Sequence, residues 1–112
     1  MFKKGDVIEL DFDPQVGAEV QKIRPAVVIS NNSINRIVPL VTVVPLRSNL
    51  QLAIPGITPI IQLTRSNGLS CDSFADMMQI KSMSIRRVKR KLGKLSDDDL
   101  AEIIANLDII FQ

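Results

Sequence analysis

"GDVIELDFD", residues 5–13, alternates apolar and polar side chains over most of its length. In an extended chain Ile8, Leu10 and Phe12 fall on one side, and the other side carries Val7 with two acids. A period of two over this length is typical of a half-buried β-strand. We therefore expect a strand here, with one apolar side and one mostly polar side.

The same extended pattern continues along the chain as far as residue 77. Further strands are expected at residues 24–30, 38–46, 59–64 and 69–77, and the segments between them carry the Gly, Pro, Asn and Ser of loops and turns. Pro39 and Pro45 interrupt the third strand, and proline in a sheet favours an edge or a bulge. The sequence thus predicts a small β core with its third strand at an edge or bulged.

Helical patterns are confined to the last part of the chain. Residues 84–91 predict a short basic helix that ends at Leu92-Gly93, with the glycine in a left-handed cap. Farther on, Ser96 is a favourable N-cap and three aspartates follow it at the positive end of the helix dipole. The helix then presents an apolar stripe of Leu100, Ile103, Ile104, Leu107, Ile110 and Phe111. The expected fold is mainly β with helices: a small, partly open barrel of about five to seven short strands, closed at one end by this helix.

Composition narrows the class of protein. A chain of 112 residues with 46% apolar residues fits one globular domain, residues 1–112. Because there is one cysteine, Cys71, and no histidine, neither an intrachain disulfide nor a common metal-ligand cluster is expected, and we expect no cofactor. The start MFKKG has no apolar segment behind its lysines, and no stretch is long enough to span a bilayer. These features predict a cytoplasmic protein.

Positive charge is concentrated in residues 81–94. Seven of the 14 Lys and Arg residues fall in this acid-free stretch, and four acids follow between residues 97 and 102. One interpretation is a solvated surface whose cations are balanced by the acids of the next element. The other is a basic footprint for a phosphate backbone.

Two long segments resemble one protein family. "GDVIELDFDPQVGAEVQKIRPAVVISNN", residues 5–32, is similar to the amino-terminal half of MazF/PemK toxins, with a Gly-Asp strand, an Asp-Pro loop containing Gly-x-Glu, and an Arg-Pro strand in that order. "ADMMQIKSMSIRRVKRKLGKLSDDDL", residues 75–100, is similar to the family's glutamine-containing strand end, basic turn and final helix opened by Leu-Ser. The resemblance implies a Src-homology-3-like barrel that dimerises and cleaves single-stranded RNA without metal, as the toxin of a type II toxin–antitoxin pair.

Arg24 is the first candidate catalytic residue. Attack of a ribose 2′-hydroxyl on its phosphate requires a proton acceptor, a proton donor and positive charge on the phosphate oxygens. A guanidinium matches two phosphate oxygens and stays charged at cellular pH. Pro25 biases Arg24 toward extended backbone, which restricts the direction of the side chain. The alternative is that Arg24 is only the polar end of a buried strand.

The resemblance also implies a threonine or serine near the end of the third strand, as a donor to the scissile phosphate. In "VVPLRSN", residues 43–49, a gapless alignment puts Arg47 at that place and Ser48 one residue later. Either a bulge next to Pro45 brings Ser48 into position, or Arg47 contributes a second cation, or the activity is altered. Ser48 is retained as a catalytic candidate, and its alternative role is to cap the turn at residues 48–49.

Other candidates come from the loop and from the second matching segment. Glu19 matches the family's Gly-x-Glu acid and is a candidate base or partner of Arg24, or simply an exposed loop residue. Gln79 could bond a phosphate or a base edge, or be a satisfied amide at a strand end. The candidate RNA-binding cations are Lys22, Arg47, Lys81, Arg86 and Arg87. Because Trp and Tyr are absent, RNA binding should be mainly electrostatic and salt-sensitive.

Two other classes of function remain open. The chain could poison a protein target, as in the gyrase-binding CcdB group, although that group relies on a carboxy-terminal tryptophan and this chain ends in DIIFQ. It could also bind RNA or protein without cleavage, which the arginine at position 47 favours. The family resemblance implies three partners: single-stranded RNA, a second copy of the chain in a homodimer, and an antitoxin whose acidic, disordered tail covers the basic site.

Overall fold

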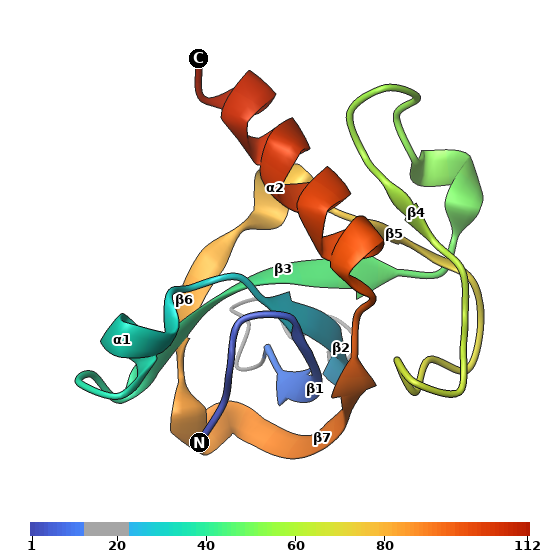
Figure 1. Cartoon of the computed structure of the whole chain (residues 1–112). Coiled ribbons are helices and arrows are strands. Elements are labelled where there is room, and N and C mark those ends of the chain that lie inside the picture. Colours follow the sequence, from blue (N-terminus) through green and yellow to red (C-terminus); the bar gives the residue numbers. More distant parts are fainter. Residues whose placement is uncertain (13–22) are drawn as a thin grey trace, which may run out of the picture.

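A computed structural model describes residues 1–12 and 23–112. In these residues seven strands form a strongly curled sheet, a partly open barrel, and one long helix crosses it (Figure 1). The strands are β1 (Asp6–Asp11), β2 (Ile23–Val28), β3 (Leu40–Arg47), β4 (Ile60–Ile61), β5 (Ser73–Ala75), β6 (Lys81–Ser84) and β7 (Val88–Lys94). The helices are α1 (Asn32–Asn35), α2 (Asp97–Ile110) and the 3-10 turns η1 (Leu50–Leu52), η2 (Met77–Gln79) and η3 (Ile85–Arg87). The predicted fold class is confirmed.

β3 is the central strand of the sheet. The strand order is β4-β5-β3-β2-β1-β7, with every pairing antiparallel, and β6 also pairs with β3. The prediction that β3 lies at an edge or is bulged is therefore wrong. Pro45 is tolerated because its backbone faces the break between β6 and β5, where its carbonyl accepts a hydrogen bond from the Asp76 N–H at 2.9 Å. A missing N–H at this break removes no ladder hydrogen bond.

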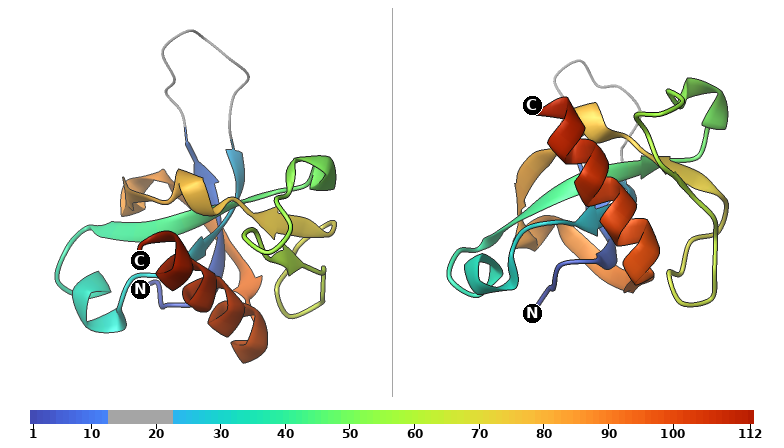
Figure 2. Two further views of the ribbon diagram at one scale, coloured as in Figure 1. Left: turned by 90° about the horizontal axis from the view of Figure 1, so that it is seen from above. Right: turned by 45° about the horizontal axis from the view of Figure 1, so that its top comes forward.

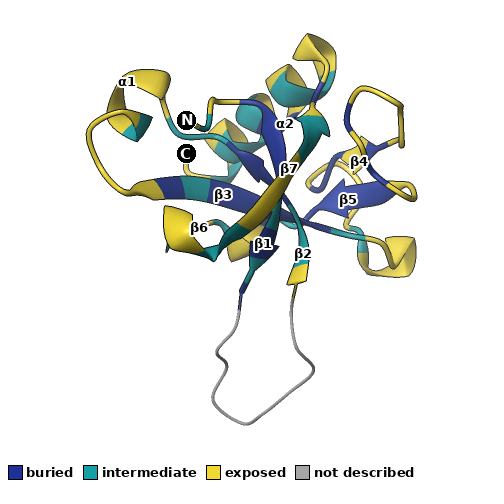
Figure 3. Cartoon of the chain, turned by 90° about the horizontal axis from the view of Figure 1, so that it is seen from below, coloured by how far each residue is buried: buried dark blue, intermediate teal, exposed yellow. Residues whose placement is uncertain are grey.

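Both faces of the central strands are buried, so two cores form (Figure 3). One core lies between the sheet and α2, and it includes Val7, Val27 and Ile103. The other lies inside the curl of the sheet, and it includes Ile8 and Val28. The expected polar side of the first strand is thus wrong at its start, because α2 covers the side that carries Val7.

The carboxy-terminal helix is confirmed, but its predicted apolar stripe is wrong at Phe111, which follows the end of α2 and is largely exposed. Ser96 caps α2 by accepting a hydrogen bond from the Asp99 N–H at 3.1 Å. Ile103 is fully buried in the core under α2, and Leu100, Leu107 and Ile110 pack against that core. Figure 2 shows that the carboxyl end of β1 and the amino end of β2 point away from α2. The helix therefore closes one side of the sheet and leaves those strand ends uncovered by it.

The basic helix predicted at residues 84–91 is wrong. Only η3 is helical, and residues 88–94 form the strand β7, which pairs with β1. Gly93 is not a left-handed cap. A Cβ at Gly93 would lie 2.2 Å from the carbonyl oxygen of Ser66, so glycine permits close approach of two backbones. Pairing with β1 outweighs the local helical preference of these residues, and the local sequence does not show that this pairing partner exists.

The remaining predicted elements differ mainly in extent. The strands expected at residues 59–64 and 69–77 exist but are shorter, and the turn at residues 31–36 contains the one-turn helix α1 with Asn31 as its cap. The predicted loop at residues 13–23 lies outside the described residues except for its last position. Within the described part of the chain, no helix has the length and apolar character that crossing a membrane requires.

Candidate functional site

Arg24 lies near the start of β2, at the mouth of the inner core. Its Cα partner on β1 is Leu10, and strand alternation puts Arg24 on the same face as Ala26 and Val28, which belong to that core. Ala26 and Val28 are fully buried, whereas Arg24 is half-buried. The strand therefore anchors Arg24 by its buried neighbours and leaves its side chain at the border with solvent.

Arg47 lies at the end of β3 on the same face as Arg24. Ala26 pairs with Pro45, and the register stays regular from Val43 to Pro45, so its continuation by two residues sets Arg24 opposite Arg47. β5 continues the regular pairing on the other side, with Phe74 opposite Arg47. The bulge that would have moved Ser48 into this place is therefore not present, and that alternative is wrong.

A carboxylate and an aromatic ring hold the Arg47 side chain. Its Nη1 is 3.2 Å from Oδ2 of Asp76, and its guanidinium carbon lies 5.9 Å from the centre of the Phe74 ring. Burial and the neighbouring charge of Arg47 lower the pKa of Arg24, while Asp76 acts in the opposite direction. Asp76 thus forms an ion pair with Arg47 and attracts Arg24 only through space, and among the described residues the surplus positive charge favours an anionic ligand.

These arginines border an open pocket of about 410 Å³, here called the arginine pocket. Its lining residues are Ile23, Arg24, Pro25, Leu46, Arg47, Ser48, Asn49, Ser70, Cys71 and Ser73. Ser48 is exposed just past the end of β3, so its hydroxyl shares this pocket with both guanidiniums. Asn49, not Ser48, caps the following turn, because its side chain accepts from the Gln51 N–H at 3.2 Å.

The other predicted catalytic and RNA-binding residues fall into three groups. Lys81 and Arg87 gather at the carboxyl end of β1, since Lys81 Nζ is 5.7 Å from the Phe12 ring centre and Arg87 Nη1 donates to the Asp11 carbonyl at 3.4 Å. This end of β1 pairs with the amino end of β2, near Arg24. Gln79 and Arg86 are exposed, on η2 and η3, and do not line the arginine pocket. Glu19 and Lys22 lie outside the described residues.

Part of the basic run is neutralised by the neighbouring strand. Arg90 Nε is 3.2 Å from Glu9 Oε1, and Lys91 Nζ is 3.2 Å from Asp6 Oδ1. The acids that pair with these two cations are therefore on β1. The expectation that the acids of the following helix would pair with them is wrong. Asp97, by contrast, occupies the first turn of α2.

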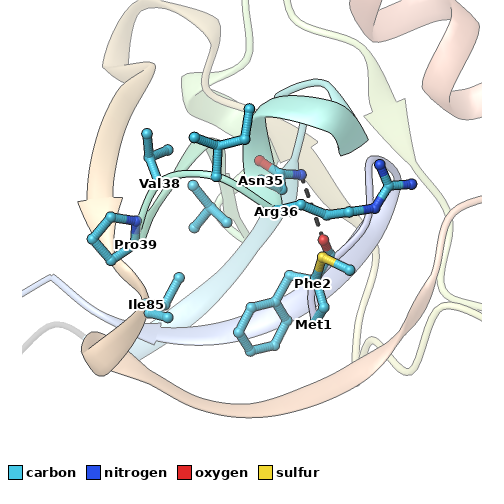
Figure 4. Close-up of a pocket in the computed structure, with 9 residues that line it drawn as sticks. Met1, Phe2, Asn35, Arg36, Val38, Pro39 and Ile85 are labelled. Carbon is cyan, nitrogen blue, oxygen red and sulfur yellow. Dashed lines mark hydrogen bonds between the residues drawn. The ribbon is translucent and has the colours of Figure 1, made fainter.

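A larger groove lies at the other end of β3 (Figure 4). Its volume is about 690 Å³, and its lining includes Phe2, Val38, Pro39 and Ile85. Asn35 closes one side by donating from Nδ2 to the Phe2 carbonyl at 3.5 Å. Of the described residues that line it, Arg36 alone has a charged side chain, so these residues do not supply the convergent polar groups that acid–base chemistry requires.

Residues 3–111 match the family model of the PemK-like, MazF-like toxin of type II toxin–antitoxin systems. The chain belongs to this family. It is 32% identical over 108 residues to Endoribonuclease MazF9 of Mycobacterium tuberculosis, covering 92% of this chain and 90% of that protein. It is 33% identical over 110 residues to Endoribonuclease MazF of Staphylococcus saprophyticus, covering 97% and 90%.

Solved structures of MazF proteins share the fold. The crystal structure of MazF from Deinococcus radiodurans superposes with a TM-score of 0.80 at 22% identity, covering 98% of this chain and 96% of that one. An endoribonuclease in complex with its cognate antitoxin, from a mycobacterial species, gives a TM-score of 0.73 at 19% identity, with 99% and 95% covered. The MazE–MazF complex from D. radiodurans gives 0.73 at 25% identity, with 98% and 95% covered.

Asp76 is the site residue that reasoning from the sequence missed. The family resemblance extends over "ADMMQIK", yet the family's glutamine drew attention to Gln79, three residues later. The available signal was the lone carboxylate of residues 76–80, DMMQI, which otherwise have apolar and amide side chains and directly follow an expected strand. Only the pairing of β5 with β3 shows that this carboxylate meets Arg47.

Proposed function

We propose that this toxin is an endoribonuclease that cleaves single-stranded RNA in the arginine pocket. The observation that carries the proposal is the position of Arg24, half-buried at the mouth of the inner core and opposite a second guanidinium. Two relatives that match over most of their length are named endoribonucleases. A pocket with surplus positive charge and a neighbouring hydroxyl suits a phosphodiester more than an apolar ligand.

The chemistry follows from this arrangement. The 2′-hydroxyl loses its proton to a base and attacks the adjacent phosphorus, the bond to the 5′-oxygen breaks, and that oxygen takes up a proton. The products are a 2′,3′-cyclic phosphate and a 5′-hydroxyl end. Arg24 stabilises the charge that develops on the phosphate oxygens, and Ser48, which lines the same pocket one residue past Arg47, is a candidate second donor to this group. Glu19 remains the candidate base, and the reaction proceeds without a metal ion.

RNA binding extends beyond the scissile phosphate. Lys81 and Arg87 continue the positive surface at the carboxyl end of β1, and Arg86 and Lys22 are candidate contacts farther along the strand of RNA. Gln79 is the candidate for a base or phosphate hydrogen bond. Because no tryptophan or tyrosine offers a stacking surface, affinity should fall steeply with salt.

We infer a cytoplasmic homodimer that is held inactive by a cognate antitoxin with an acidic segment over the arginine pocket. The apolar surface available for dimerisation includes exposed side chains around the groove of Figure 4, among them Met1, Ile37 and Ile85. Light scattering coupled to size exclusion tests the dimer, and a monomer at micromolar concentration would contradict it.

End-group analysis of treated RNA tests the activity. Purified, antitoxin-free protein is incubated with single-stranded RNA of varied sequence, with and without EDTA. Cyclic phosphate and 5′-hydroxyl ends are expected in both conditions, and they should disappear with Arg24→Ala. The matched control is Arg36→Ala, an exposed arginine at the opposite end of β3. RNA that is bound but left intact would instead support the non-cleaving binding function.

A further inference from the structure

The Arg47 side chain is fixed from two sides although more than a third of it is exposed. Asp76 binds its Nη1 at 3.2 Å, and Phe74 lies beneath the guanidinium at 5.9 Å. The side chain of Arg47 is 38% exposed and that of Asp76 only 15%. The carboxylate therefore lies below the surface and the guanidinium above it, where a ligand meets Arg47 first.

The backbone around Asp76 is itself anchored. Its N–H donates to the Pro45 carbonyl at 2.9 Å, and its carbonyl accepts from the Gln79 N–H at 3.0 Å. One bond ties Asp76 to β3 and the other ties it to η2, so the carboxylate has little freedom relative to Arg47. A contact between an exposed arginine and a fixed, mostly buried carboxylate restricts the arginine more than a contact between two mobile side chains would.

The ion pair also lowers the cost of bringing two arginines together. Strand register sets Arg24 opposite Arg47, and like charges at this spacing repel. Asp76 offsets part of that repulsion, and these three side chains of the described residues together carry one net positive charge for one ligand. A phosphodiester carries one negative charge on two oxygens, so each guanidinium can bind one of them.

We propose that Asp76 is a positioning residue that holds Arg47 beside Arg24, so that both guanidiniums bind the same RNA phosphate. This inference rests on the proposed cleavage of RNA. Arg47 would then supply, as a second cation, the contact for which the family resemblance implied a hydroxyl at this place. Asp76 does not contact the substrate in this arrangement, because it acts through Arg47.

A double-mutant cycle tests the role of Asp76. Asp76→Asn is expected to lower kcat about 5- to 50-fold, since Arg47 keeps its charge but loses its fixed direction. KM should change little, because the gain of one net positive charge opposes the cost of ordering a mobile Arg47 when RNA binds. In the Arg47→Thr background, Asp76→Asn should change kcat less than about two-fold. The control is Asp72→Asn. Asp72 is an exposed carboxylate nearby whose Oδ1 accepts a hydrogen bond from the Leu63 N–H at 2.9 Å.

A second measurement keeps this inference separate from the cleavage activity. NMR signals of the arginine Nε–H groups are followed during titration with a 2′-O-methyl RNA, which cannot be cleaved by its own 2′-oxygen. The Arg24 and Arg47 signals should both shift in the wild type. The Arg47 signal should be that of an ordered side chain in the wild type and that of a mobile side chain in Asp76→Asn.

The outcomes differ for the two proposals. If RNA remains intact while both arginine signals shift and Asp76 orders Arg47, the proposed cleavage is overturned. The proposal that both guanidiniums bind the same phosphate is then supported. If RNA is cut but Asp76→Asn lowers kcat equally in the Arg47→Thr background, Asp76 has a merely structural role and the inference is overturned. An Arg47 signal that ignores the RNA overturns it as well.

Discussion

The arginine pocket and strand β7 both carry arginine, but the two regions neutralise it differently. On β7, Arg90 and Lys91 each have a carboxylate of β1 at 3.2 Å. In the arginine pocket, Asp76 forms an ion pair with Arg47, whereas Arg24 has no ion pair with a described carboxylate. On β7 each of these cations is paired with one acid, and the pairs stabilise the edge of the sheet. In the arginine pocket the positive charges exceed the negative charge, so the site attracts an anion. Counting the basic residues of the sequence does not distinguish these arrangements.

The largest expected effect is that of Arg24→Ala on cleavage. Loss of the charge and of the planar donor should lower kcat/KM by about 10²- to 10³-fold, near 3–4 kcal/mol of transition-state stabilisation. Arg24→Lys should recover only part, because an ammonium keeps the charge but not the fork. Cleavage of a fluorogenic RNA measures both. Equal losses for Arg24→Ala and Arg90→Ala would erase the distinction between the two regions.

Gly93→Ala should show that the β7 region serves stability. The added Cβ would lie 2.2 Å from the Ser66 carbonyl oxygen, so backbones must separate, at a cost of about 1–3 kcal/mol in unfolding free energy. Urea unfolding measures this. The control is Gly56→Ala, where the new Cβ has no atom within 4 Å and only the positive φ of 80° is strained. Unchanged stability of Gly93→Ala would mean that the backbones of Gly93 and Ser66 are not in close contact.

Lys91→Ala should have a smaller effect on stability. It removes the ion-pair partner of Asp6, whose side chain is only 2% exposed but still accepts from the Lys3 N–H at 2.8 Å. We expect a loss of about 1–2 kcal/mol, measured by urea unfolding. Lys89→Ala, on the same strand and exposed, is the control. A drop in cleavage without a drop in stability would place Lys91 in the RNA-binding surface instead.

Arg90→Ala should change least. Its side chain is 67% exposed and that of Glu9 is 29% exposed, so the pair should contribute at most about 0.5–1 kcal/mol. The measurements are urea unfolding and the salt dependence of RNA affinity. Both should stay near the wild-type values. A reduced salt slope would show that Arg90 leaves Glu9 to bind a phosphate.

Much of the fold was predictable because local patterns report it. Alternation at residues 5–13, the Val-rich run after Pro25 and the cap at Ser96 each lead to the observed element. The errors arose where a distant strand decided the outcome. Residues 88–94 pair with β1 and not with themselves as a helix, and Pro45 lies in a central strand because its backbone faces a break between two partners.

The sequence by itself determined which residues carry charge and where apolar residues recur, and from them the class of fold, the family resemblance and the candidacy of Arg24. Only the tertiary structure decided which cations are free to bind an anion. The register of β2 on β3 sets Arg24 opposite Arg47, and the register of β5 on β3 gives Arg47 its carboxylate. These residues are far apart in the chain, and pairing between strands is fixed by packing of both faces of the sheet, which no local pattern encodes.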